Sequence, residues 1–173
     1  MRVYISENAF IDLLLSSAEV YKKECLGFLL GYRLEDRFIV EHAFTVQTAN
    51  RKHKGVVYDR KNHKKIEQIL TRLDKLQIIG DFHSHTQFGL TKGLPIPSQE
   101  DIKEMLPGHV YLIVAINNNQ KTLLWGENRD GTISGSISEF FFKISAYFLN
   151  NGNGVTSAKR ARIHCPFPPG FRV

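Results

Sequence analysis

Two stretches of the chain repeat apolar residues at helical spacing. In the first, the apolar residues that share one face are Phe10, Leu13, Leu14 and Val20. Ser6 precedes this run and predicts a helix that its hydroxyl caps. The second stretch runs from Asp59 to Leu76, and its shared face consists of Ile66, Ile69, Leu70, Leu73 and Leu76. Both patterns predict amphipathic helices that bury one face against a core.

Short apolar runs between polar turns predict strands at residues 26–32 and 38–46, joined through Glu35-Asp36, and another strand that ends at Phe82. Residues 109–116 and 122–127 predict a hairpin that turns through the polar residues between them. No internal repeat is visible. We therefore expect an α/β (α+β) fold, a mixed and twisted β-sheet flanked by helices.

The C-terminal part differs in character from the rest. Residues 138–149 contain many aromatic side chains that fit neither the helical nor the strand period, so both a helix and a strand remain open. Residues 150–154 resemble a linker, and residues 159–172 mix basic, aromatic and proline residues. We expect one domain over residues 1–149 and a tail over 150–173, either disordered or an extended arm on the body or on a partner.

Composition is consistent with a single compact domain of 173 residues with a tail. No run approaches the roughly 20 apolar residues that span a bilayer, and the N-terminus has no signal-peptide core. We therefore expect a cytoplasmic protein without membrane association. Cys25 and Cys165, the only cysteines, lie far apart and predict neither a disulfide scaffold nor a cysteine-rich zinc site. Cys25 is expected to be a small core residue.

The positive charge is concentrated in one region. The net charge is +6, and residues 51–75 hold nine Lys or Arg against three Asp or Glu. Such a field could attract nucleic acid, an anionic membrane or an acidic protein, and it is equally typical of a solvated helix face.

Candidate chemistry begins at His83-Ser84-His85, which follows the apolar run of residues 76–82. Residues two apart on a strand point to the same side, about 7 Å apart at their Cα atoms, so the two imidazoles can converge on one ion. A polar strand end is the simpler explanation. Two imidazoles and a carboxylate would suit a zinc ion whose fourth coordination position is open to water.

A carboxylate is available in Ser98-Gln99-Glu100-Asp101, which follows Pro95 and Pro97 and predicts the start of a helix. Ser98 and Asp101 also have a purely structural explanation. A serine followed three residues later by an acid is typical of a helix N-terminus, where the hydroxyl caps the backbone and the carboxylate favours the helix dipole.

A third segment is Glu24-Cys25-Leu26-Gly27-Phe28-Leu29-Leu30-Gly31, in which a glutamate stands before a buried strand. The order of a glutamate before G-x-L-x-G, then H-x-H, then S-x-x-D resembles the JAMM motif of the MPN (Mov34/PAD-1, JAB) family of zinc metalloproteases. The resemblance covers about the first 130 residues. It implies the MPN/JAB, cytidine-deaminase-like architecture.

The resemblance also implies roles for five residues. His83, His85 and Asp101 would be the zinc ligands. Glu24 would accept a proton from zinc-activated water and deliver it to the leaving amine. Ser98 would donate a hydrogen bond to the oxyanion of the tetrahedral intermediate.

Two departures from the family pattern lie between the histidines and the serine. Thr86 stands where the motif has a proline, and twelve residues intervene where about seven are usual. Gly89 and Gly93 allow this loop, Thr86–Pro97, to bend, and closure entropy rises only slowly with length. The loop is either a lid or substrate-contacting element, or a tolerated surface insertion.

Other hydrolase classes fit less well. The H-x-E and P-C-x-x-C signatures of zinc deaminases and the H-E-x-x-H of zincins are absent, and the barrel amidohydrolase fold needs about 250 residues. A cysteine protease using Cys25 has only composition in its favour. The resemblance implies cleavage after the C-terminal tail of ubiquitin or a ubiquitin-like protein. Alternatives are processing of a sulfur-carrier protein, a non-catalytic MPN scaffold that binds partners, and a nucleic-acid-associated protein. The sequence leaves the oligomeric state open.

Overall fold

A computed structural model describes residues 1–47, 50–51, 56–57, 60–72, 76–119, 121–152 and 155–166. The helices are α1 (Glu7–Glu19), α2 (Arg60–Leu70) and α3 (Gln99–Glu104). The strands are β1 (Arg2–Ile5), β2 (Leu26–Arg33), β3 (Arg37–Thr45), β4 (Asn50–Arg51), β5 (Val56–Val57), β6 (Gln77–Thr86), β7 (Val110–Asn118), β8 (Gly126–Glu127), β9 (Ile133–Ile137), β10 (Phe140–Gly152) and β11 (Val155–His164).

The main sheet has the order β11-β1-β3-β2-β6-β7-β10-β9-β8, and β11 pairs with β10 as well as with β1. One edge of β10 pairs with β7, and the other pairs with β9 along its first half and with β11 along its second. The strands from β11 to β10 therefore close into a ring. Parallel and antiparallel pairs both occur, so the predicted mixed sheet and α+β class are confirmed, with a core dominated by the sheet.

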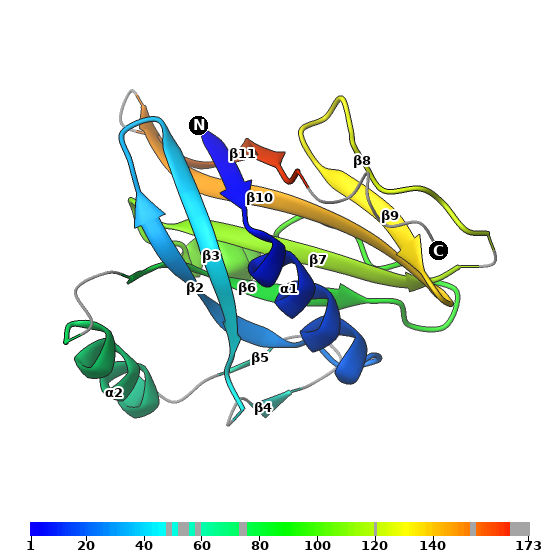
Figure 1. The fold of residues 1–173 in the computed structure, drawn as a ribbon, viewed down its shortest axis with the longest axis horizontal. Coiled ribbons are helices and arrows are strands. Elements are labelled where there is room, and N and C mark those ends of the chain that lie inside the picture. Colours follow the sequence, from blue (N-terminus) through cyan, green and yellow to red (C-terminus); the bar gives the residue numbers. More distant parts are fainter. Residues whose placement is uncertain are drawn as a thin grey trace.

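Helix α1 packs against β3, β6 and β7 of this sheet (Figure 1). Ser6 caps it as predicted, because its hydroxyl accepts a hydrogen bond from the Ala9 N–H. Phe10, Leu13 and Leu14 are buried in the main core, again as predicted. Burying this apolar stripe against the strands holds the helix on the sheet.

Helix α2 is described over part of the predicted range, and Asp59 and Leu73 lie outside the described residues. Its Ile66 packs against a second cluster, formed by Leu26, Phe28 and Val46. Ile69, predicted on the same buried face, is 62% exposed. The cytidine-deaminase-like description of the architecture stays a prediction.

After residues 83–85, one sequence prediction is wrong and one open alternative is decided. Residues 109–116 and 122–127 do not form a hairpin: β7 pairs with β6 and β10, residues 122–125 form no strand, and β8 pairs with β9. The ambiguous residues 138–149 belong largely to the long strand β10. Their pattern fitted neither period because β10 is covered on both faces, by the main core and by the loop that carries Pro95.

The predicted tail is largely a strand. β10 crosses residue 149, where we expected the domain to end, and β11 returns beside it with Ala161 and Ile163 buried in the main core. Residues 155–164 are therefore an extended segment packed on the body, one of the two alternatives. Residues 167–173 lie outside the described part of the chain.

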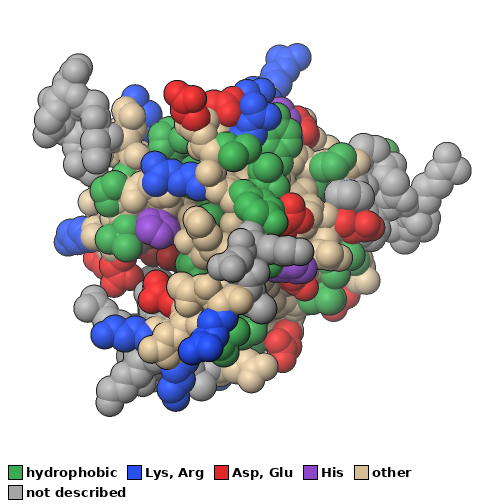
Figure 2. Space-filling model, turned by 60° about the vertical axis from the view of Figure 1, so that its left-hand side comes forward, with side chains coloured by type: hydrophobic (Ala, Val, Ile, Leu, Met, Phe, Trp, Pro, Cys, Tyr) green, Lys and Arg blue, Asp and Glu red, His purple; other side chains and the backbone are tan. Residues whose placement is uncertain are grey.

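On the face drawn in Figure 2, Lys and Arg side chains are interspersed with Asp and Glu. From the predicted basic region, Lys64, Lys65 and Arg72 are exposed, whereas Lys52, Lys54 and Lys75 lie outside the described residues. Among the described helices, none has the length and apolar character needed to cross a membrane.

Candidate metal centre

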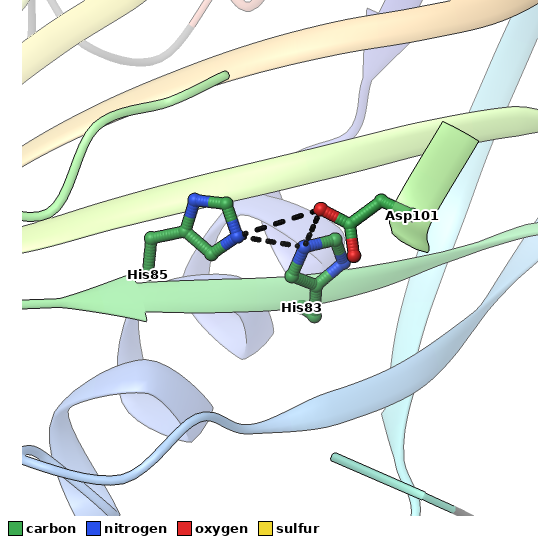
Figure 3. A group of neighbouring side chains, drawn as sticks. All are labelled: His83, His85 and Asp101. Atoms are coloured by element: carbon green, nitrogen blue, oxygen red, sulfur yellow. Dashed lines mark hydrogen bonds and ion pairs between the residues drawn. The ribbon is translucent and has the colours of Figure 1, made fainter. Parts of the chain in front are cut away.

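Strand β6 presents both histidines on one face. It lies between β2 and β7, and its alternation directs Phe82 and Ser84, both fully buried, to the inner side. His83 and His85 consequently point to the outer side, where Asp101 reaches them from the first turn of α3 (Figure 3). The three side chains that the sequence suggested as ligands are thus brought together.

The distances among these three residues fit a metal site. The Nε2 atoms of His83 and His85 are 3.0 Å apart, and the Asp101 carboxylate oxygen Oδ2 lies 3.5 Å from the first and 3.8 Å from the second. Zinc bound at 2.0–2.1 Å by four tetrahedral ligands places those ligands about 3.3 Å from one another. Two imidazole nitrogens and one carboxylate are also a donor set that zinc accepts.

A backbone carbonyl fixes the tautomer of His85. Its Nδ1 lies 2.7 Å from the carbonyl oxygen of Leu94. A carbonyl oxygen can only accept, so Nδ1 carries the proton and Nε2 turns a lone pair toward the other two ligands. Hydrogen bonds of this kind orient metal-binding histidines and raise their basicity.

Asp101 and Ser98 form a capping box at the start of α3. The Ser98 hydroxyl accepts a hydrogen bond from the Asp101 N–H at 3.1 Å, and the Asp101 carboxylate accepts one from the Ser98 N–H at 2.6 Å. The structural explanation of these two residues is therefore confirmed. It also serves the cluster, since the same Oδ2 atom that caps the helix faces the histidines.

Charges around the histidines shift their proton affinities. Burial lowers the pKa of His83. This effect is outweighed by the hydrogen bond and charge of Asp101 and by the charges of Asp81 and Glu24, so the pKa of His83 lies above its ordinary value of 6.5. Burial and the charge of His83 lower the pKa of His85. Burial opposes ionisation of Asp101, yet its hydrogen bond to His83 holds its pKa well below the usual range. A cation would therefore compete with a proton mainly at His83.

Glu24 lies beside the cluster at the entrance to β2. Its charge acts on His83, and Leu26 pairs with His83 across the two strands. The neighbouring Cys25 is fully buried, as expected. Its N–H donates to the Ser84 hydroxyl at 2.9 Å, and its carbonyl accepts from the Ser84 N–H at 3.1 Å. The serine between the two histidines thus fixes the backbone next to Glu24.

Two of the anchors that bond the long loop Thr86–Pro97 to the sheet flank Leu94. Asn117 of β7 accepts from the Gly93 N–H at 2.8 Å and donates to the Gly93 carbonyl at 3.1 Å. The Pro95 carbonyl accepts from the hydroxyls of Ser145 at 2.6 Å and Tyr147 at 3.0 Å. Since Leu94 lies between these anchors, its carbonyl is held in place for His85. A role as a closing lid stays a prediction.

Sequence reasoning missed several residues that support the centre. Asp81 lies on the same face of β6, and burial raises its pKa to about 7, with the charge of His83 opposing this. The period of two through Asp81, His83 and His85 was a signal for it. Leu94 contributes a backbone carbonyl, and Asn117 bonds Gly93 from another strand. The type of either residue therefore gave no indication in the sequence that it supports the centre.

Comparisons with known proteins show the family and agree with the fold. The family described as prokaryotic homologs of the JAB domain matches residues 6–126. One similar solved structure is the solution structure of protein DSY2949 from Desulfitobacterium hafniense, with 16% identity and a TM-score of 0.65, covering 94% of this chain and 92% of that chain. At that identity the likeness shows the fold alone. No curated protein matches.

Proposed function

Because the chain belongs to the family of prokaryotic homologs of the JAB domain, we propose that it is a zinc-dependent peptidase. Its proposed substrate is the C-terminal tail of ubiquitin or a ubiquitin-like protein, either as a conjugate or as a precursor. The observation that carries the proposal is the convergence of the His83, His85 and Asp101 ligand atoms within 4.8 Å, with the His85 tautomer set for ligation. The substrate class rests on the family resemblance.

The proposed roles come from the family resemblance, and the positions of the side chains support them. His83, His85 and Asp101 would hold the ion, and zinc, when bound, polarises oxygen atoms and lowers their proton affinity. The carboxylate of Glu24 would accept a proton from the attacking water and pass it to the leaving amine. The charge of Glu24 acts on His83, and the adjacent backbone is fixed through Cys25 and Ser84, which supports this role.

Capping and catalysis are compatible at Ser98. In the capping box its oxygen accepts a hydrogen bond, which uses a lone pair and leaves the hydroxyl hydrogen to donate elsewhere. The side chain is exposed beside the ligand cluster. We therefore assign it the donation to the oxyanion that develops on the substrate carbonyl.

The test is incubation of the purified chain with a panel of ubiquitin-like fusion proteins, followed by mass measurement of the products. We expect cleavage after the ubiquitin-like tail with zinc and none with a chelator. Glu24→Gln keeps the size of the side chain but removes the base, so turnover should fall about 10²–10⁴-fold while zinc stays bound. Near wild-type turnover in this variant would remove Glu24 from the mechanism.

A second candidate is a non-catalytic scaffold that binds protein partners. It would retain the fold and cleave no member of the panel, with or without zinc. Presence of all five motif residues favours the peptidase over the scaffold. Processing of a sulfur-carrier protein is a variant of the same activity, and including such a protein in the panel distinguishes it. Nucleic-acid binding through the basic region has no recognised motif in its favour.

A further inference from the structure

Strand β11 places an arginine on the face of the sheet that carries the histidines. The register runs from Arg160 through Tyr147 of β10 and a residue of β7 to Asp81 of β6. Directly paired residues share a face of the sheet, and Asp81 lies on the same face as the two histidines. The basic segment that the sequence placed in a tail thus contributes a side chain to the face of the candidate metal centre.

Arg160 fixes the direction in which Tyr147 donates its hydrogen bond. The Nη2 and Nε atoms of Arg160 lie 2.9 Å and 3.3 Å from the hydroxyl oxygen of Tyr147, and the guanidinium carbon lies 5.5 Å from the centre of the ring. A guanidinium can only donate, so the hydroxyl oxygen accepts, and its one hydrogen is left for the Pro95 carbonyl at 3.0 Å. A charged donor on this oxygen also strengthens the hydrogen bond that the hydroxyl donates.

The Pro95 carbonyl controls the direction of the carbonyl before it. Ser145 and Tyr147 both donate to the Pro95 carbonyl, at 2.6 Å and 3.0 Å. The amide between Leu94 and Pro95 has no N–H through which the loop could be held. A proline ring instead locks the torsion φ, at about −65°, between that amide plane and its own Cα atom. Holding the Pro95 carbonyl therefore restricts the Leu94 carbonyl, which lies 2.7 Å from Nδ1 of His85.

We propose that Arg160 and Tyr147 are positioning residues for His85, so that the docked strand β11 forms part of the candidate metal centre. The proposal rests on the proposed function, in which His85 is a zinc ligand. Neither positioning residue touches the ion. Cutting the path at Tyr147 frees the Leu94 carbonyl to move, and the ring of His85 then loses the acceptor that keeps its Nε2 atom unprotonated for the ion.

The first measurement needs no metal. The ring nitrogens of His85 are observed by ¹⁵N NMR in the metal-free chain at about pH 8, where an ordinary imidazole is neutral. The wild-type chain should show the Nδ1–H tautomer. Tyr147→Phe, which removes only the hydroxyl, and Arg160→Leu, which keeps an apolar side chain, should each show a mixture of the two tautomers. A loss of stability alone would not change the tautomer.

The second measurement is zinc affinity by competition with a chromophoric chelator. Each of the two variants should raise the zinc dissociation constant about tenfold, because a bond that orients a metal ligand is loosened. The double variant should bind zinc no more weakly than Tyr147→Phe alone, because Arg160 acts through the hydroxyl that this variant lacks.

Two variants serve as matched controls. Arg162→Leu removes the next outward arginine of β11, whose Nη2 lies 3.4 Å from the carbonyl oxygen of Arg129, and should keep the wild-type tautomer and affinity. Lys143→Leu removes a second cation from Asp130, the carboxylate that pairs with Arg160 at 3.6 Å, and should keep both as well. Circular dichroism of each variant checks that the fold is intact.

A wild-type tautomer or a wild-type zinc affinity in either folded variant would overturn the proposal and leave the two residues a structural role. Additive losses of affinity in the double variant would overturn it too, since Arg160 would then act by another route. Failure of the proposed function has a different signature. The wild-type chain would then cleave no fusion protein, while the tautomer of His85 in the metal-free chain still gave its own result.

Discussion

Replacing Gly93 by alanine should weaken zinc binding, although Gly93 is not one of the proposed zinc ligands. A methyl group at this position would overlap the carbonyl oxygen of His85 and lie 2.7 Å from its carbonyl carbon. Carbon atoms in contact are ordinarily about 3.5–4.0 Å apart, so the loop must move away from β6 by about 1 Å. The bond between the Leu94 carbonyl and His85 Nδ1, now 2.7 Å, would then exceed hydrogen-bonding distance.

Two consequences can be given magnitudes. Loss of a hydrogen bond that orients a metal ligand typically lowers affinity about 10–100-fold, and we expect a zinc dissociation constant higher by that factor. Overpacking typically costs about 1–3 kcal/mol, which for a chain of this size lowers the melting temperature by roughly 2–12 °C. Affinity is measured by competition with a chromophoric chelator well below the melting temperature, and stability by calorimetry.

Matched variants separate the cause from a general loss of stability. Gly126→Ala adds the same methyl group where no atom lies within 4 Å, so both zinc affinity and stability should stay at the wild-type level. Asn117→Ala removes the loop anchor without a clash and should also weaken zinc binding, because the Gly93 backbone loses both hydrogen bonds. A folded Gly93→Ala protein that binds zinc as tightly as Gly126→Ala would refute this role of the loop.

Three further predictions concern the centre itself. The purified chain should hold about one zinc, and His83→Ala or Asp101→Ala should lose most of it, because three ligands leave little redundancy. Full zinc occupancy in both variants, measured by metal analysis, would show that the ligands were assigned wrongly. Ser98→Ala should lower the free energy of unfolding by about 0.5–2 kcal/mol and the turnover about 10²–10³-fold, whereas Ser98→Asp should keep the cap and stay inactive. Wild-type stability together with wild-type turnover in Ser98→Asp would exclude the oxyanion role. Zinc affinity should fall as the pH decreases through the raised pKa of His83, beginning above pH 6.5, because a proton on His83 competes with the ion. Equal zinc affinities at pH 8 and pH 6, measured by chelator competition, would contradict this.

Sequence patterns predicted the elements whose two sides differ. The stripe of α1, its Ser6 cap and the strand that carries the histidines were predicted because one face of each meets the core. Strand β10 was ambiguous because both of its faces are covered. For β11, the prolines from Pro166 onward suggested an irregular tail, although the alternation of buried Ala161 and Ile163 with exposed Arg160 and Arg162 was a strand signal within it.

The centre was predictable to the extent that it consists of side chains at short spacing. His83 and His85 share a strand, and Asp101 follows within one loop, so residue types and order indicated the cluster. The parts that position it act over a distance. The Leu94 carbonyl, the Asn117 clamp on Gly93 and the contact of Ser84 with Cys25 depend on tertiary contacts that no local pattern encodes.

The closure of the sheet through β11 has a consequence for how the chain folds. Val3 near the start of the chain pairs with Ile163 near its end, so almost the whole sequence separates these partners. At a synthesis rate of about 5–20 residues per second, β1 waits many seconds on the ribosome before β11 emerges. Contacts of such high sequence separation form slowly. During that interval the free edge of β1 is open to pairing with other chains, so completion of the last strand is the step that protects this edge of the nascent protein from aggregation.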